Sequence, residues 1–516
     1  MLPTVDNCNV PEDPMFRPWT PPLLVCALTL VAGCDRREAG SETASVVTTD
    51  TAAASAAAAA GAVPLSTNSD EARRLYLEAR AVAEQLRAHE GRKLYEQAAA
   101  ADPTFAMAHY QLALNSATAK DFLAHMKEAV ALSDRASEGE RLFILAADAG
   151  GNANPAKALE YQEELVKKYP RDERAHQLLG TAYFGRQEYD KAIEQYRAAT
   201  AINPSFSPAY NLLGYAYRNL EKYDSAEAAF TKYIELIPGD PNPYDSYAEL
   251  LLKMGRFDES IAQYHKALEH DANFVASKVG IATNLMYQGK HQAGAAEMDR
   301  LYQHARDDGE RRTALFVKGV ILVDGGKTDA ALKEIQREYD LDVKLADTAN
   351  MSGDALLLGN ILLDAGRLDA AEQQFTRSLA LVEKSSLSQD VKEDTRLADQ
   401  YNRGRVALAR GDYAAAGTAA EAYAKGAEAR HNLFRVRQAH ELTGRIALAQ
   451  KQYDQAIAHL GQANQQDPAV LYSTALALKA KGDAAKAKEV AAEAANANIL
   501  PLISYAFVRD EARRMS

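Results

Sequence analysis

Residues 173–206 read ERAHQLLGTAYFGRQEYDKAIEQYRAATAINPSF, and residues 207–240 read SPAYNLLGYAYRNLEKYDSAEAAFTKYIELIPGD. Aligned without a gap, the two stretches repeat each other at a fixed offset of 34 residues. The matched pairs are His176 with Tyr210, Leu179 with Leu213, Gly180 with Gly214, Tyr183 with Tyr217, Ala192 with Ala226, Tyr196 with Phe230, and Pro204 with Pro238. Matches of this kind at one offset indicate a structural repeat.

Each stretch has the pattern of two helices joined by a turn. In the first stretch, apolar side chains recur at helical spacing on both sides of residues 188–190. Gly180 and Ala192 are small where two antiparallel helices must approach closely. Pro204 lies where the second helix should end, because proline cannot continue a helix interior. One such pair cannot bury its apolar side alone, so the pattern predicts a stack of pairs.

A helix–turn–helix repeat of 34 residues with these positions resembles the tetratricopeptide repeat (TPR). Degenerate copies extend over most of residues 72–496, and residues 106–138 form the least regular one. The resemblance implies an all-α solenoid of about twelve units in a right-handed superhelix. We expect a TPR array over 69–384 and an irregular joint at 385–396, which either extends two helices or separates two sub-arrays. Further units and a capping tail follow at 397–516.

The N-terminal region has the features of an exported lipoprotein. An apolar run from Leu23 to Val31 has the length of a signal peptide and is too short to span a bilayer. It ends in Val31-Ala32-Gly33-Cys34, which resembles the bacterial lipobox, so we expect a signal peptide at 1–33 and acylation of Cys34. The acidic residues before Met15 fit a signal badly, and we infer that translation begins at Met15. An apolar N-terminus without lipid remains the alternative.

Residues 34–68 are predicted to be a tether, because they are rich in Ala, Ser and Thr without an amphipathic period. All three cysteines, Cys8, Cys26 and Cys34, lie before or at its start. The mature chain is therefore expected to have no disulfide and no cysteine nucleophile. We expect location in the bacterial cell envelope on the periplasmic side. Asp35 after the lipidated cysteine favours the inner membrane, as it does in enteric bacteria.

The sequence does not predict an enzyme, a cofactor or a metal site. His440-Glu441 lacks the second histidine of a helical zinc-protease motif, since the required position is Gly444. We interpret it as an ordinary helix surface. Gly325-Gly326-Lys327-Thr328 lacks the earlier glycine of a phosphate loop, which position 321 would supply, and lies in a predicted turn. The net charge of −12 argues against nucleic-acid binding.

The resemblance to TPR proteins implies where a ligand would bind. In that family the second, fifth, ninth and twelfth residues of each first helix line a concave groove. Mapped onto this sequence, the predicted protein-binding residues are Gln177, Thr181, Phe184, Asn211, Tyr215, Arg218, Asp245, Glu249 and Met286. The alternative is that they are exposed polar residues without a ligand. The clamp that some TPR proteins use for a C-terminal carboxylate is not expected, because Asp245 and Glu249 would repel it.

The sequence therefore favours a non-enzymatic, membrane-anchored scaffold that binds protein or peptide segments. The lipid anchor would hold it at the membrane, and nucleic acid is not an expected partner. The second hypothesis is a regulatory or sensor TPR protein that acts on a signalling partner. No motif identifies the partner.

Overall fold

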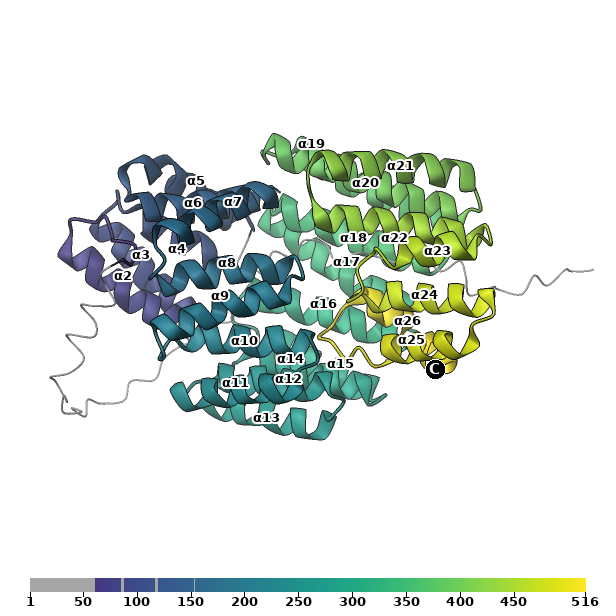
Figure 1. The fold of residues 1–516 in the computed structure, drawn as a ribbon, viewed down its shortest axis with the longest axis horizontal. Helices are drawn as coiled ribbons and strands as arrows, with labels where there is room; N and C mark the ends of the chain where they lie inside the picture. Colours follow the sequence, from purple (N-terminus) through teal and green to yellow (C-terminus); the bar gives the residue numbers. More distant parts are fainter. Residues whose placement is uncertain (1–60, 85–87, 117–118, 153) are drawn as a thin grey trace, which may run out of the picture.

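The computed structural model describes residues 61–84, 88–116, 119–152 and 154–516. Within these residues it contains 25 α-helices and no strand. Figure 1 shows the helices stacked side by side in chain order, which confirms the predicted all-α solenoid. The predicted signal peptide and Cys34 lie outside the described residues.

The helices follow one another as twelve antiparallel pairs and one last helix. The first six pairs are α2 (Asp70–Ala83) with α3 (Ala88–Ala101), α4 (Ala106–Leu114) with α5 (Ala119–Leu132), α6 (Glu138–Gly151) with α7 (Pro155–Lys168), α8 (Glu173–Gly185) with α9 (Tyr189–Ile202), α10 (Ser207–Asn219) with α11 (Tyr223–Leu236), and α12 (Pro241–Lys253) with α13 (Phe257–His270). The other six are α14 (Val275–Tyr287) with α15 (His291–Gln303), α16 (Asp308–Asp324) with α17 (Thr328–Leu345), α18 (Thr348–Asp364) with α19 (Leu368–Lys384), α20 (Gln389–Ala409) with α21 (Tyr413–Ala429), α22 (Leu433–Ala449) with α23 (Tyr453–Leu460), and α24 (Pro468–Lys481) with α25 (Ala484–Ala495). The last helix is α26 (Ile503–Met515).

Local chemistry sets where the helices begin. The Asp172 side chain accepts hydrogen bonds from the backbone N–H groups of Arg174 and Ala175, and so caps α8. Pro241 and Pro468 occupy the first positions of α12 and α24, where the missing N–H of proline costs nothing.

The turn inside several pairs contains one residue with positive φ. This position is Gln187 (φ 64°) after α8 and Glu221 (φ 55°) after α10, and it becomes Gly255 and Gly289 in the next two repeats. Glycine adopts this conformation at little cost, whereas the other two residues are held in it by the packed helices.

The small residues of the repeat lie at the predicted helix contacts. A Cβ atom on Gly180 would lie 2.5 Å from Tyr196, and one on Gly214 would lie 2.5 Å from Phe230. Both aromatic rings are fully buried. The first helix of each of these two pairs therefore needs glycine at this place to admit the ring from the second helix.

The array curves until its C-terminal repeats lie against its earlier ones (Figure 1). Arg437 on α22 donates to the side chain of Gln187 at 2.8 Å and to the backbone oxygen of Arg186 at 3.2 Å. Gln187 in turn donates to Asn464 at 2.6 Å. The contact between Arg437 and Gln187 joins residues 250 positions apart, so the curvature of the whole array makes it possible.

The predicted irregular joint at 385–396 is mostly helical. Helix α20 begins at Gln389, and Ser388 caps it by accepting a hydrogen bond from the backbone of Val391. Only residues 385–388 separate α19 from α20. The polar stretch therefore lengthens a helix, which was one of the two alternatives, rather than forming an irregular joint.

The last residues of the predicted tether belong to the folded part. The backbone N–H of Val63 donates to Asp172 at 2.9 Å, and that of Ser66 donates to Glu140 at 3.1 Å. The Thr67 hydroxyl donates to Asp102 at 2.6 Å. Residues 63–67 are thus held across the first repeats, and the tether ends near residue 61 instead of 68. The sequence did not reveal this because two of the three bonds use the tether's backbone.

Two faces of the first helices as candidate binding sites

The predicted binding residues on α8, α10 and α12 lie four and seven residues apart within each helix, so they share one side of it, and we call them together the polar face. It comprises Gln177, Thr181, Phe184, Asn211, Tyr215, Arg218, Asp245 and Glu249. Thr181 is exposed, whereas most of the others are partly buried. Phe184 packs edge-on against Tyr189, with 5.2 Å between the ring centroids.

Three residues of the polar face form a network between neighbouring repeats. The Tyr215 hydroxyl donates to Glu249 at 2.9 Å, and Arg218 donates to the other oxygen of Glu249 at 3.0 Å. The Arg218 guanidinium also lies over the Tyr215 ring, 4.7 Å from its centroid. Burial and the charge of Glu249 raise the pKa of Tyr215 well above its ordinary value, so the hydroxyl stays a donor. These contacts fix the side chains before any ligand arrives.

Asn211 carries a polar atom that the fold leaves unused. Its side-chain oxygen Oδ1 is buried and has no hydrogen-bond partner. Buried acceptors are nearly always paired, so an unpaired one needs a reason. A backbone N–H or another donor of a bound segment would supply the missing partner once the Asn211 side chain turns toward the surface.

Asp245 was predicted to face a ligand, but it is buried between two repeats. The residue is 4% exposed and accepts a hydrogen bond from Ser277 of the next repeat at 2.6 Å. Burial and the nearby charge of Glu249 raise its pKa well above the ordinary value. Asp245 therefore joins two repeats, and it does not act as an exposed negative charge.

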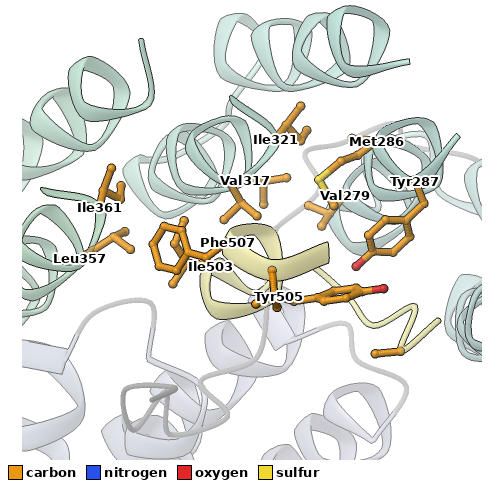
Figure 2. Close-up of a cluster of buried hydrophobic side chains, with 14 of the residues drawn as sticks. Val279, Met286, Tyr287, Val317, Ile321, Leu357, Ile361, Ile503, Tyr505 and Phe507 are labelled. Atoms are coloured by element: carbon orange, nitrogen blue, oxygen red, sulfur yellow. The ribbon is translucent and has the colours of Figure 1, made fainter. Parts of the chain in front are cut away.

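Met286 is also buried, in a hydrophobic cluster to which the last helix contributes side chains. We call the surface of α14, α16 and α18 at this cluster the apolar face. Met286 is 2% exposed and belongs to one hydrophobic cluster with Val279, Val317 and Phe507. Figure 2 shows the residues of α26 lying among those of the three first helices. The tail was predicted to cap the last repeat, and α26 does contact α24 and α25, but it contacts α16 as well.

A cluster of buried charges lies between the repeats of the apolar face. Arg312 on α16 is 3.1 Å from Glu338, 3.3 Å from Asp342 and 3.4 Å from Asp354. One guanidinium cannot neutralise three buried carboxylates. Burial raises the pKa of Glu338 to about 7 and, together with the charge of Glu338, that of Asp354 to about 10. The cluster therefore holds protons at neutral pH.

The motifs that superficially suggested chemistry have structural roles. Glu441 is 4% exposed and pairs with Arg445 at 3.1 Å, so the predicted surface position is wrong for this residue. A Cβ on Gly444 would lie 2.8 Å from Leu460, which explains the glycine by packing. His440 does approach His459, with 3.1 Å between the two Nδ1 atoms. Across the described residues, no group of three or more His, Cys, Asp or Glu side chains could hold a metal ion.

The Gly325–Thr328 segment forms the turn between α16 and α17 and follows a helix rather than a strand. Gly326 has a φ of 70°, as the turn requires. The turn lines an open hollow of about 600 Å³ with Lys290 and His291. The His291 ring is already engaged by Asp324 at 2.7 Å.

Comparison with known proteins identifies the family. The tetratricopeptide-repeat family model matches residues 145–206, 178–241 and 279–344. The chain contains tetratricopeptide repeats. The matched segments include both stretches on which the sequence resemblance rested. TPR arrays in general serve as scaffolds for protein interaction rather than as catalysts.

Three solved structures match parts of this chain at low sequence identity. A TPR protein from Parabacteroides merdae is 14% identical, with a TM-score of 0.34, over 52% of this chain and 93% of its own. A thermophilic TPR protein from Thermus thermophilus is 23% identical, with a TM-score of 0.29, over 42% and 99%. The MamA protein is 17% identical, with a TM-score of 0.26, over 31% and 88%. No curated protein matches this TPR chain.

Proposed function

We propose that this TPR protein is a membrane-anchored scaffold of the bacterial cell envelope. Its polar face would bind a segment of another protein. The unpaired Oδ1 of Asn211, set beside the fixed side chains of Tyr215 and Arg218, is the observation that carries the binding site. Such a face offers a donor, an acceptor and aromatic surface to a peptide, as protein-binding surfaces commonly do.

The proposal of a lipid anchor is based on the sequence before residue 61. The lipobox-like residues end in Cys34, and an acylated cysteine carrying several chains would hold the protein stably on a bilayer. In the part of the chain that the structure describes, no helix is long and apolar enough to cross a membrane. Residues 63–67 are bound to the first repeats, so a tether of residues 34–60 would leave the array from a fixed place.

The binding site is tested by placing a photo-crosslinker at the exposed Thr181 on α8 in living cells. The matched control is Glu194, which is exposed on the second helix of the same repeat. We expect one discrete cross-linked protein from position 181, none from position 194, and loss of the product on Asn211→Ala. Equal products from both positions would show that the polar face has no special affinity.

The anchor is tested independently by Cys34→Ala and cell fractionation. The wild type should sediment with membranes, and the variant should be released by washing. Cleavage before Cys34 would also remove Trp19, the only tryptophan, so the mature protein should show tyrosine fluorescence alone. A tryptophan emission band in the purified mature protein would contradict signal cleavage.

A further inference from the structure

Helix α26 lies outside the twelve pairs and packs against two distant parts of the array. It contacts α24 and α25, which precede it, and α16, which lies far earlier in the chain. Tyr505, Val508 and Ala512 are at most 1% exposed. In Figure 2, Phe507 and Ile503 lie between Val317 and Leu357, and Tyr505 lies below Tyr287. The helix therefore occupies the apolar face in the way that a bound helical ligand would.

One charged residue of α26 is buried in this contact. Arg509 donates through Nε to Asp324 at 2.6 Å and through Nη2 to its other oxygen, across 185 residues of sequence. Both side chains are 1% exposed. The Arg509 guanidinium also lies 5.1 Å from the centroid of Tyr287.

A buried ion pair contributes little net stability, because desolvation offsets much of the attraction. Its geometric effect is larger, since a bidentate carboxylate accepts an arginine in one orientation. Burial alone would raise the pKa of Asp324, but hydrogen bonds from His291 and Arg509 hold it below the ordinary value. Asp324 thus presents a fixed negative charge at one end of an apolar surface, which selects a helix with an arginine at the matching place.

The segment that leads into α26 attaches to the array through backbone hydrogen bonds and through apolar side chains that pack on the same hydrophobic cluster as α26. Lys253 donates to the backbone oxygen of Ala497 at 3.2 Å, and the Tyr287 hydroxyl donates to that of Ile499. Residues 496–502 are not helical, and Pro501 lies shortly before α26 begins. Because the segment is not helical, α26 and the segment can leave the apolar face together without unwinding α25.

We propose that the apolar face of α14, α16 and α18 is a receptor for an amphipathic helix of a partner protein. The partner's helix would place aromatic and aliphatic residues against Val317 and Leu357 and an arginine against Asp324. Helix α26 is the chain's own occupant of this receptor and competes with the partner. This inference rests on the proposed scaffold role and gives the chemistry of one partner, on a surface separate from the polar face.

The competition predicts how strongly a partner binds. A tethered helix acts at an effective concentration in the millimolar range, so it holds the site against a free helix of equal affinity. The apparent affinity for the partner is the intrinsic affinity multiplied by the fraction of molecules in which α26 has left the face. A change that weakens α26 without altering the receptor should therefore strengthen binding in trans.

The first experiment measures displacement on an unaltered receptor. Ser504 on α26 is fully buried, and its hydroxyl has no partner, so Ser504→Cys places a protected thiol in the contact. Cys8→Ser, Cys26→Ser and Cys34→Ser remove the other thiols from the full chain, and the probe is a synthetic peptide of residues 502–516. We expect saturating peptide to raise the rate of thiol labelling at least tenfold. The control Ser260→Cys, buried in α13 and outside the hydrophobic cluster that holds α26, should not respond. An unchanged rate at position 504 would overturn the proposal.

The second experiment measures binding of the same peptide, fluorescently labelled, to full-length variants. Arg509→Ala should bind it at least tenfold more tightly than the wild type, whereas Arg513→Ala, on the exposed side of α26, should match the wild type. Adding Asp324→Ala to Arg509→Ala should remove that gain. Equal affinities of the single and double variants would refute recognition through Asp324. Thr181 cross-linking and peptide displacement are separate measurements, so either proposal can fail alone.

Discussion

Helices α10 and α14 hold the same place in their repeats and carry opposite chemistry. Two repeat lengths separate Asn211 from Val279 and Arg218 from Met286. In α10 these positions belong to a polar network with an unpaired acceptor, whereas in α14 they are buried with α26. Both helices nevertheless use a glycine to admit a ring from a second helix. Gly214 admits Phe230 of its own repeat, and Gly280 admits Tyr264 of the preceding one.

The difference shows that the repeat determines the architecture, while the residues it leaves free decide what each face binds. A polar face can stay in contact with water until a ligand arrives. A run of apolar residues on a first helix must be covered, since exposed apolar patches of this kind are costly. In this chain the cover is its own last helix.

The largest expected effect comes from placing a charge on the apolar face. Val317→Asp puts a carboxylate under α26, where it would be buried among apolar side chains, and should cost roughly 3–5 kcal/mol. Thr181→Asp makes a comparable change on the exposed polar face and should alter stability by less than about 0.5 kcal/mol. Thermal unfolding of both variants measures the contrast. A similar loss of stability in the two variants would mean that Val317 is no more buried than Thr181.

The twelve pairs could be predicted from the sequence because the residues that define them are local and recur. Gly180 and Tyr196 lie in one repeat, and their equivalents return in the next. The extended α20 was one of two alternatives for residues 385–396, and the sequence did not decide between them because this stretch interrupts the repeat.

Burial of Met286 and Asp245 could not be predicted in this way. Met286 lies in one hydrophobic cluster with residues of α26, which begins at Ile503, and only the curvature of the array brings them together. The one hint was compositional, because Val279 and Met286 are apolar at positions that carry polar residues in α10. Whether the polar face binds a protein stays a prediction.

An intermediate effect concerns the charges buried behind the apolar face. Because Glu338 has a raised pKa of about 7, the fold binds a proton that the unfolded chain releases near pH 4.5. The stability that this proton adds to the fold is complete below pH 4.5, and it is lost as the pH rises to about 7. Glu338→Gln should remove this loss, so that between pH 5 and 8 the variant loses about 1–3 kcal/mol less stability than the wild type. Thermal unfolding at several pH values measures it.

Asp340→Asn is the matched control for this prediction, because Asp340 is exposed on the same helix. Its stability should follow the wild type at every pH. Parallel curves for the wild type and Glu338→Gln would show that Arg312 keeps Glu338 ionised. The buried charges behind the apolar face would then add no pH dependence to the stability of the fold.

The smallest expected effect tests whether the polar face is fixed in advance. Tyr215→Phe removes the hydroxyl that donates to Glu249, and Glu249→Gln weakens both the Tyr215 and the Arg218 contacts. Each change should cost about 0.5–1.5 kcal/mol, since a net hydrogen bond contributes about that much. A double-mutant cycle from thermal unfolding should then give a coupling of at least about 0.5 kcal/mol. Additive losses would mean that the side chains do not act together, and that a ligand would have to order this face itself. In that case the polar face would differ from the apolar one in rigidity as well as in chemistry, because α26 already orders the apolar face.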